Sequence, residues 1–196
     1  MILKEYKAYI FDLDGVIVST DDCHYVAWRQ LADEENIYFD RQINERLRGV
    51  SRMESLEIML EKATKDYSEE EKIEMAQRKN GYYVESIKTL DRTALLPGAL
   101  EFIVNAKSKG IKVAIGSSSK NAIAILEQIN CLDLFDAIAD GNDIKNSKPA
   151  PDVFLTAARK LNIAPECCMV VEDAAFRCGG SNCCKYGCSG SGLCIG

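Results

Sequence analysis

Acidic residues close two short apolar runs of the sequence, in positions where they could bind a cation. Asp12 and Asp14 stand two residues apart in FDLDGV, and Glu172 and Asp173 end the run CMVVED. Side chains two residues apart at a strand end can point the same way, and carboxylates gathered there repel one another unless a cation joins them. Hard oxygen ligands of this kind suit Mg²⁺. The four acids therefore predict a magnesium site at one edge of a sheet.

A second group of polar residues has the chemistry needed to hold an anion. GSSSKN follows the run KVAI and begins a helical pattern, so its hydroxyls and free backbone N–H groups would form a binding site for a phosphate. SKPAPD adds Lys148 as a point charge. Each motif alone also has a structural explanation, because acids and serines are common in turns and helix caps and single lysines usually lie in solvent. Four such motifs at successive strand ends favour an active site.

Strands and helices alternate in the part of the chain that carries these motifs. Apolar runs ending in polar residues predict strands at 7–13, 112–118, 136–140 and 168–173. Apolar residues recur at helical spacing within 99–106, 122–129 and 154–161. This alternation predicts an α/β fold with a Rossmann-like parallel sheet whose two faces are covered by helices.

The segment between the first two expected strands has a different pattern. From about residue 19 to 90 there is no strand signal, and Ser51 with Glu54 and Ser68 with Glu71 have the spacing of capping boxes at helix starts. We therefore expect an inserted α-helical cap. The predicted division is a core of residues 1–16 and 92–176, a cap of 17–91 and a tail of 177–196.

Composition favours a globular enzyme or binding protein. The chain has 196 residues, of which 47% are hydrophobic, and a net charge of −6, which argues against binding to a nucleic-acid backbone. Charged residues interrupt the N-terminal MILKEYKAYIFDLDG, so we expect neither a signal peptide nor a membrane span. Cysteines are few up to Asp173, as is usual for unpaired thiols in a reducing compartment. The expected protein is a cytoplasmic monomer with no nucleic-acid or membrane partner.

The motifs DLDG, GSSSKN, SKPAPD and VVED, in this order and spacing, resemble those of the haloacid dehalogenase superfamily of phosphotransferases. The resemblance covers roughly residues 6–176 and implies that superfamily's Rossmann-like core with an inserted cap. Within it, the insert is similar to the β-phosphoglucomutase branch, because it carries HYVAW, RGVSR and RKNGYY.

The resemblance implies a role for each residue of the core motifs. Asp12 would be the nucleophile that takes the phosphoryl group as an aspartyl phosphate, and Asp14 would be the general acid and base. Ser117 and Lys148 would stabilise the phosphoryl oxygens during transfer. The implied ligands of Mg²⁺ are Asp12, the backbone carbonyl of Asp14, Glu172 and Asp173.

The cap would bind the phosphate that is not being transferred. RGVSR lies at an expected helix start, where backbone N–H groups and the guanidinium of Arg52 could hold that phosphate. His24 would position Asp14, whereas Trp28 also suits simple packing. The other residues assigned to substrate binding are Gly49, Val50, Ser51, Lys79 and Asn80 in the cap and Ser119, Lys120 and Asn121 in the core.

The implied activity is the interconversion of β-D-glucose 1-phosphate and glucose 6-phosphate, with a bisphosphate intermediate and small sugar phosphates as the only partners. Two alternatives stay open. A phosphatase of the same superfamily would use water as the acceptor. An inactive remnant is the other alternative, because the sequence departs from the family pattern after VVEDAA.

The tail RCGGSNCCKYGCSGSGLCIG holds five of the nine cysteines of the chain. Its spacing does not suit zinc, since adjacent cysteines and a single distant histidine fit no common ligand pattern. A disulfide knot would require an oxidising compartment. Read in a shifted frame, permitted codons from Arg177 give GVEAAIAANMAV, which begins with the glycine that the family has there. We therefore expect a frameshifted, truncated and disordered tail.

Overall fold

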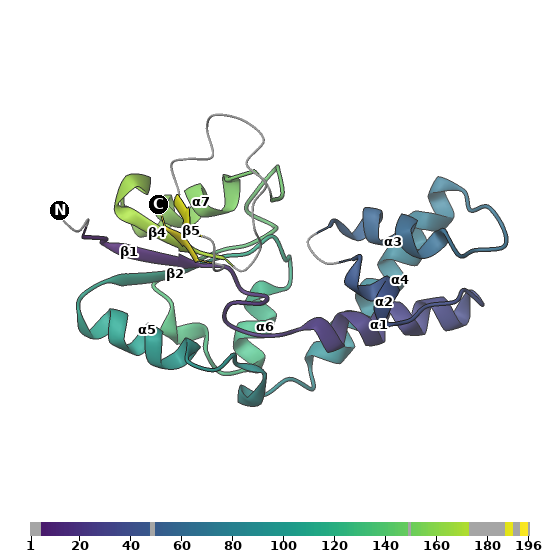
Figure 1. The fold of residues 1–196 in the computed structure, drawn as a ribbon, viewed down its shortest axis with the longest axis horizontal. Coiled ribbons are helices and arrows are strands. Elements are labelled where there is room, and N and C mark those ends of the chain that lie inside the picture. The colour runs from purple at the N-terminus through teal and green to yellow at the C-terminus, as the bar shows by residue number, and fades with distance from the viewer. Residues whose placement is uncertain (1–4, 48–49, 149, 173–186, 190–192, 196) are drawn as a thin grey trace. The chain divides into compact units, whose positions relative to one another are not determined.

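The computed structural model describes residues 5–47, 50–148, 150–172, 187–189 and 193–195 (Figure 1). The chain divides into two compact units: a core unit of Met1–Ser19 with Leu90–Gly196, and a cap unit of Thr20–Thr89. The sequence predicts a cap that begins at residue 17. Residues 17–19 belong to the core unit instead, because Val18 forms β-bridges with both Asp14 and Leu95.

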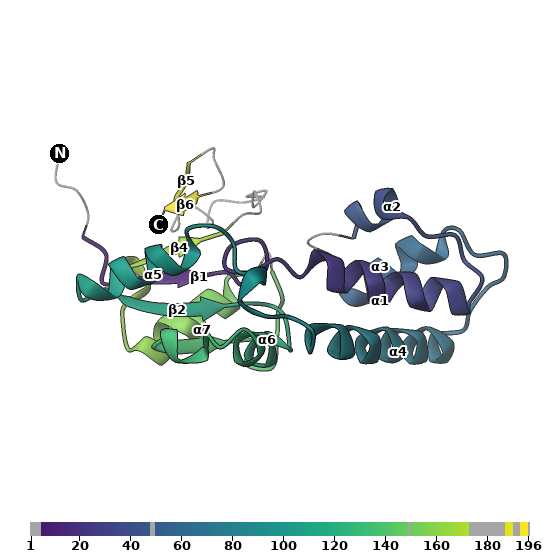
Figure 2. The same ribbon diagram turned by 90° about the horizontal axis from the view of Figure 1, so that it is seen from below.

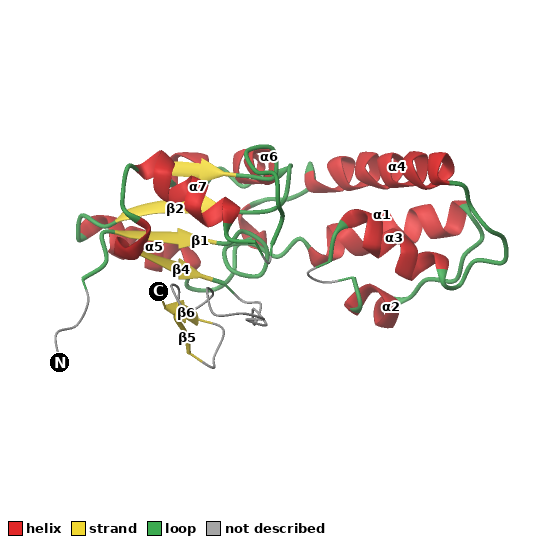
Figure 3. Ribbon diagram, turned by 90° about the horizontal axis from the view of Figure 1, so that it is seen from above, coloured by secondary structure: helices red, strands yellow, loops and turns green. Residues whose placement is uncertain are grey.

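The core unit contains one parallel sheet. Its strands lie in the order β3-β2-β1-β4, as Figure 3 shows for the three that it labels. Their bounds are β1 Ala8–Phe11, β2 Lys112–Gly116, β3 Ala137–Ala139 and β4 Cys168–Val171. All three strand pairs are parallel, with Ile10 opposite both Ala114 and Val170. The four expected strands and the parallel sheet are thus confirmed.

Helices cover both faces of this sheet (Figure 2). Successive strand residues point to opposite faces, so both faces carry apolar side chains that pack against helices. The core-unit helices are α5 Ala99–Ser108, α6 Ala122–Gln128 and α7 Asp152–Leu161, with short 3-10 turns at Arg92–Ala94, Leu132–Leu134 and Pro165–Cys167. Ile10 on one face packs in a cluster with Phe154 of α7. On the other face the rings of Tyr9 and Phe11 lie 5.4 and 5.8 Å from the ring of Phe102 in α5. The three helices expected from apolar spacing are confirmed.

Helices are the regular secondary structure of the cap unit in its described residues, and turns and loops connect them. Its helices are α1 Asp21–Glu34, α2 Arg41–Glu45, α3 Arg52–Leu60 and α4 Glu69–Ile87. Both predicted capping boxes are present. The hydroxyls of Ser51 and Ser68 accept from the N–H groups of Glu54 and Glu71, whose carboxylates accept in return. Such a cap is worth about 1 kcal/mol and sets where each helix begins.

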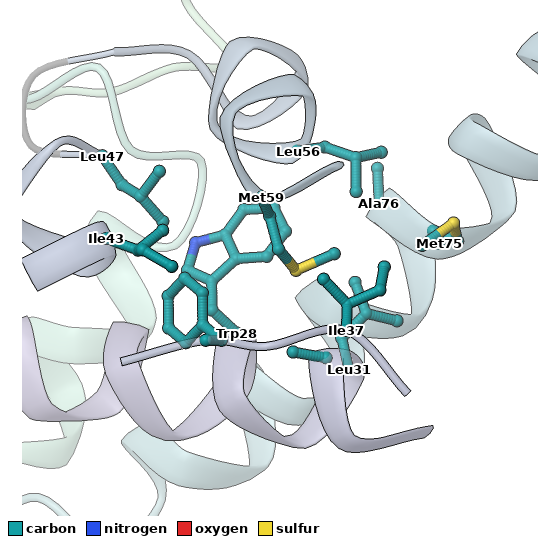
Figure 4. Close-up of a cluster of buried hydrophobic side chains, with 11 residues drawn as sticks. Trp28, Leu31, Ile37, Ile43, Leu47, Leu56, Met59, Met75 and Ala76 are labelled. Carbon is teal, nitrogen blue, oxygen red and sulfur yellow. The ribbon is translucent and has the colours of Figure 1, made fainter. Parts of the chain in front are cut away.

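The cap unit has a hydrophobic core of its own (Figure 4). The indole of Trp28 lies at its centre among side chains from all four helices, and it is only 3% exposed. Burial of each large side chain contributes about 1.5 to 3 kcal/mol. The other members include Leu31, Ile37, Ile43, Leu47, Leu56, Met59, Met75 and Ala76.

The tail is described in two short segments. Gly187–Ser189 and Leu193–Ile195 form the antiparallel strands β5 and β6 of a separate sheet. The expectation of a disordered tail is wrong for these two backbone segments, in which Gly187 pairs with Ile195 and Ser189 with Leu193. The tail residues 177–186, with three of its cysteines, lie outside the described residues.

Cysteines earlier in the chain are free, as expected: Cys23, Cys131, Cys167 and Cys168. Within the described part of the chain, no helix combines the length and apolar character that crossing a bilayer requires.

Candidate active site

The carboxyl ends of three parallel strands bring candidate residues to one edge of the sheet. Asp12 follows β1, Ser117 follows β2 and Glu172 follows β4. Their backbones continue the ladder, because Asp12 N–H donates to the Val171 carbonyl at 2.9 Å and Ser117 N–H to the Ala139 carbonyl at 3.0 Å. The three residues are 9%, 2% and 3% exposed, respectively. A parallel sheet therefore collects these polar side chains in a largely dry environment.

Lys148 joins the two carboxylates of this edge. Its Nζ lies 2.6 Å from Oδ1 of Asp12 and 3.0 Å from Oε2 of Glu172. The Lys148 side chain is itself only 15% exposed. We name Asp12, Lys148 and Glu172 the carboxylate–lysine cluster. Its charges are buried and paired, as buried charges must be, but two acids share one base.

Burial and the closeness of two carboxylates change the acidity of Glu172. Burial and the neighbouring charge of Asp12 raise the pKa of Glu172 to about 8, although Lys148 opposes the rise. A carboxyl with so high a pKa is one whose ionised form lacks sufficient cationic partners.

The donor set fits an oxygen-binding divalent cation at this edge. Mg²⁺ prefers hard carboxylate oxygens as ligands. Added positive charge would also stabilise the ionised form of Glu172. Only part of the expected ligand set can be seen. Among the described residues, no three His, Cys, Asp or Glu side chains form a group able to hold a metal. Asp173, the remaining expected carboxylate, lies outside the described residues.

Asp14 lies in a tight loop after β1. Gly15 in this loop has φ +83°, and its N–H donates to the Val18 carbonyl at 2.8 Å. The N–H groups of Ile17 and Val18 both donate to the carbonyl of Leu13. Because only glycine adopts such a φ readily, Gly15 allows the chain to reverse directly after Asp14. Asp14 remains partly exposed beside the buried Asp12.

The GSSSKN segment is arranged differently from the open phosphate seat expected from its sequence. The N–H of Ser119 donates to Oγ of Ser117 at 3.1 Å, and the N–H of Asn121 donates to Oγ of Ser119 at 3.2 Å. Short hydroxyl side chains commonly bond the backbone two residues ahead. The prediction that these N–H groups are free is therefore wrong, and Lys120, which is exposed, is the charged group of the segment.

Three residues that the sequence prediction missed support Lys148. The backbone N–H of Lys148 donates to Oγ of Ser118 at 3.3 Å. Its ammonium lies 4.9 Å from the ring centroid of Phe154, a cation–π distance. Gly116 makes room for this ring, since a Cβ there would lie 2.7 Å from Phe154 Cδ1. The available sequence signal for Ser118 was its position between Ser117 and Ser119, two residues that were predicted. Phe154 had only the apolar spacing of a buried helix position.

A second cluster lies in the cap unit, between α1 and α4. Nζ of Lys79 lies 2.9 Å from Nδ1 of His24 and 4.9 and 4.8 Å from the ring centroids of Trp28 and Tyr83. Tyr83 also stacks on His24, with centroids 4.2 Å apart. Lys79 is only 3% exposed. We name His24, Trp28, Lys79 and Tyr83 the aromatic–lysine cluster.

The aromatic–lysine cluster determines the charge and tautomer of His24. Burial, followed by the charges of Lys79 and Arg52, lowers the pKa of His24 to about 3. The imidazole is therefore neutral at pH 7, and Nδ1 accepts a hydrogen bond from the Lys79 ammonium. The proton of the neutral ring then resides on Nε2, which becomes a donor.

Tyr83 was missed by the sequence prediction, which selected Lys79 and Asn80 from RKNGYY. Its position four residues after Lys79 on α4 was the available signal, since residues so spaced share a helix face. Trp28 is buried in the cap core, which agrees with the packing role that its sequence also allowed. The face of its ring lies near the ammonium of Lys79.

Arg52 and Asn80 meet beside this cluster. Nη2 of Arg52 donates to Oδ1 of Asn80 at 2.8 Å, and burial lowers the pKa of the Arg52 guanidinium. The N–H of Ser51 donates to the carboxylate of Glu54, and its hydroxyl accepts from the Glu54 N–H. The Ser51 N–H that was expected to bind phosphate is therefore already used in the capping box. Val50 is 40% exposed. Gly49 lies outside the described residues.

The two sets of residues can perform different chemistry. A buried carboxylate with an adjacent ammonium is suited to nucleophilic attack on an electrophile that carries negative charge, because the ammonium reduces the repulsion. Arg52, Asn80 and the aromatic–lysine cluster combine cations with hydrogen-bond donors, which suits recognition of an anionic ligand.

Known proteins resemble the chain over most of its length. The family model for haloacid dehalogenase-like hydrolases matches residues 6–176. β-Phosphoglucomutase of Bacillus subtilis is 45% identical over 170 residues, which are 86% of this chain and 75% of that protein. A phosphorylated carbohydrates phosphatase of Thermotoga maritima is 33% identical over 172 residues, 86% of this chain and 76% of its own length.

The fold agrees with this family. A crystal structure of β-phosphoglucomutase from Clostridium difficile superposes with a TM-score of 0.76 at 46% identity, over 86% of this chain and 77% of that one. From the family match and these identities it follows that the chain belongs to the haloacid dehalogenase-like hydrolase family.

Proposed function

We propose that the protein is a phosphomutase that interconverts β-D-glucose 1-phosphate and glucose 6-phosphate. The carboxylate–lysine cluster is the observation that carries this proposal, because it pairs a buried nucleophilic carboxylate with a cation at a sheet edge. The identity of 45% to a β-phosphoglucomutase supports the choice of substrate.

Asp12 acts as the nucleophile in this proposal. Its Oδ attacks the phosphorus of a bisphosphate, forming an aspartyl phosphate as the bond between phosphorus and the sugar oxygen breaks. Asp14 protonates that leaving oxygen and later removes the proton from the attacking sugar hydroxyl. Lys148 and Ser117 stabilise the charge on the phosphoryl oxygens.

In this proposal Mg²⁺ would be held by Asp12, Glu172, Asp173 and the backbone carbonyl of Asp14. When bound, the ion supplies positive charge that reduces the repulsion between the attacking carboxylate and the phosphate dianion. The raised pKa of Glu172 supports a cation at this position.

Arg52 and the cap residues bind the second phosphate. The guanidinium carries a planar set of donors that matches phosphate oxygens, and Asn80 holds one of its nitrogen atoms in place. Lys120 and Asn121, with the hydroxyl of Ser119, are the core-unit residues that the proposal assigns to substrate binding. Neutral His24 adds an Nε2–H donor to the cap residues, and the hydrogen bond from Lys79 to Nδ1 fixes that tautomer.

A sugar-phosphate phosphatase is the second candidate. The relative from Thermotoga maritima, a phosphorylated carbohydrates phosphatase at 33% identity, favours it. The two activities differ in the acceptor of the phosphoryl group, which is a sugar hydroxyl in one case and water in the other.

The test is to incubate the chain with Mg²⁺, β-glucose 1-phosphate and a catalytic amount of glucose 1,6-bisphosphate. We expect glucose 6-phosphate to form faster than inorganic phosphate. Release of phosphate as the main product would support the phosphatase, and an absence of both products would support an inactive remnant. The Asp12→Asn variant controls for contaminating enzymes.

A further inference from the structure

The loop that follows β3 lies directly against the GSSSKN segment. Its residues 140–143 read DGND, and they make two hydrogen bonds to backbone carbonyls of that segment. The N–H of Gly141 donates to the carbonyl of Ser119 at 3.1 Å, and Nδ2 of Asn142 donates to the carbonyl of Lys120 at 3.2 Å. We name residues 140–143 the supporting loop.

Gly141 is required by the closeness of this contact. A Cβ at this position would lie 2.4 Å from the carbonyl oxygen of Ser118 and 3.0 Å from the amide nitrogen of Lys120. Both atoms belong to the backbone, so no rotation of a side chain could relieve the overlap. Any other residue at position 141 would displace either the supporting loop or the GSSSKN segment. By contrast, a Cβ at Gly81 in α4 would meet nothing within 4 Å.

The supporting loop is itself firmly held. The carboxylate of Asp140 accepts from the backbone N–H and the side-chain Nδ2 of Asn142, at 2.8 and 3.2 Å. Oδ2 of Asp143 accepts from the N–H of Asp140 at 3.0 Å and from Nζ of Lys160 in α7 at 2.7 Å. The loop is therefore anchored to α7, and movement on its side of the contact is restricted.

The charges of the supporting loop bear on its role. Two aspartates close to an anion site would weaken anion binding by repulsion. Here Asp140 is satisfied by Asn142 and Asp143 by Lys160, so hydrogen bonds and an ion pair reduce that effect. The loop thus supplies backbone and side-chain contacts to Ser119 and Lys120, and one of its two negative charges is paired with Lys160.

We propose that Gly141 and Asn142 are positioning residues that hold Ser119 and Lys120 in the geometry needed to bind a sugar phosphate. This inference rests on the proposed function. A displacement of about 1 Å in a binding group can cost up to about 100-fold in activity, so a rigid support for this segment has a direct consequence.

The experiment compares Gly141→Ala and Asn142→Ala with two matched controls. Gly81→Ala adds the same methyl group where space is open, and Asn105→Ala removes an exposed asparagine side chain from α5 of the same unit. Circular dichroism establishes a temperature at which each variant is folded. Hydrogen exchange at the amides of residues 118–121 and the dissociation constant of glucose 6-phosphate are then measured for each.

We expect Gly141→Ala to accelerate exchange in residues 118–121 and to weaken binding by about tenfold or more. Loss of one hydrogen bond in Asn142→Ala should weaken binding by about two- to tenfold. Both controls should stay within about twofold of the unmodified chain. If Gly141→Ala does not fold, Asn142→Ala decides the matter.

Unchanged exchange in residues 118–121, or faster exchange with unchanged affinity, would overturn the inference. A uniform change of exchange over the whole core unit would also contradict it, because that result indicates general destabilisation. Failure of the unmodified chain to bind any sugar phosphate would count against the proposed function and with it against a role in phosphate binding. The exchange measurement would still decide separately whether the supporting loop holds the segment.

Discussion

The carboxylate–lysine cluster of the core unit and the aromatic–lysine cluster of the cap unit surround a buried lysine with different kinds of side chain. Each buries a lysine ammonium. In the core, Lys148 lies between the carboxylates of Asp12 and Glu172. In the cap, Lys79 lies against a neutral imidazole and two aromatic rings. An ammonium can thus be buried by paired charge or by the electron-rich faces of rings.

This difference indicates which charge of ligand each cluster favours. In the core, burial and the neighbouring charge of Asp12 raise the pKa of Glu172, and two acids around one base favour an added cation. In the cap, burial followed by the charges of Lys79 and Arg52 lowers the pKa of His24, and these two cations favour an added anion. A cation and a phosphate are what the proposed reaction requires.

The largest expected effect is at the nucleophile. Asp12→Asn should abolish phosphoryl transfer, by about 10⁴-fold or more, because an amide oxygen cannot form the acyl phosphate. The measurement is turnover of β-glucose 1-phosphate together with trapping of a phosphorylated protein. Substantial turnover in this variant would show that the core cluster is not the reacting one.

Asp14→Asn should have a smaller effect that depends on the leaving group. General acid and base catalysis contributes about 10² to 10⁴-fold, so conversion of the sugar phosphate should fall by that factor. Phosphorylation by an aryl phosphate, whose leaving group needs little protonation, should be partly retained. Equal losses with both substrates would remove Asp14 from the acid and base role.

Arg52→Ala tests whether the cap cluster binds the second phosphate. Removal of one partner from a desolvated charge pair costs about 2 to 5 kcal/mol, so mutase turnover should fall while hydrolysis of a small aryl phosphate changes little. Arg46→Ala is the matched control, because Arg46 forms an exposed ion pair with Glu61 in the same unit. Arg52→Lys keeps the charge but loses the planar set of donors, and should restore activity only in part.

If Arg52→Ala reduced turnover of both substrates equally, Arg52 would not act specifically in binding the second phosphate.

The smallest expected effect concerns stability. The pKa of His24 is about 3 in the folded chain and about 6.5 when unfolded. Between these values only the unfolded chain binds the proton, so stability falls as the pH decreases below about 6.5. From pH 7 to pH 5 the free energy of unfolding should fall by about 1 to 2 kcal/mol more in the unmodified chain than in His24→Gln.

Urea unfolding at the two pH values measures this difference. His24 is the only histidine of the chain, so its titration can also be followed by NMR without assignment. A midpoint near pH 6.5 would contradict the aromatic–lysine cluster as described.

Local patterns were sufficient to predict the four strands and three helices of the core unit and the starts of α3 and α4 in the cap unit. Strands and helices followed from apolar spacing, and Ser51 and Ser68 marked two helix starts, because capping and periodicity depend on residues only a few positions apart. Parallel strands then required that Asp12, Ser117 and Glu172 reach the same edge. The roles of the individual site residues stay predictions.

Contacts between distant segments decided the rest. Phe154 beneath Lys148, Tyr83 against His24, and Gly141 against Ser118 join residues whose sequence patterns alone indicated packing or a turn. The serine hydroxyls of GSSSKN also bond their own backbone, although the sequence had predicted free N–H groups. Residue types and spacing determined which chemical groups this protein possesses. Tertiary packing decided their partners and charges, because burial and close approach depend on atoms that are far apart along the chain.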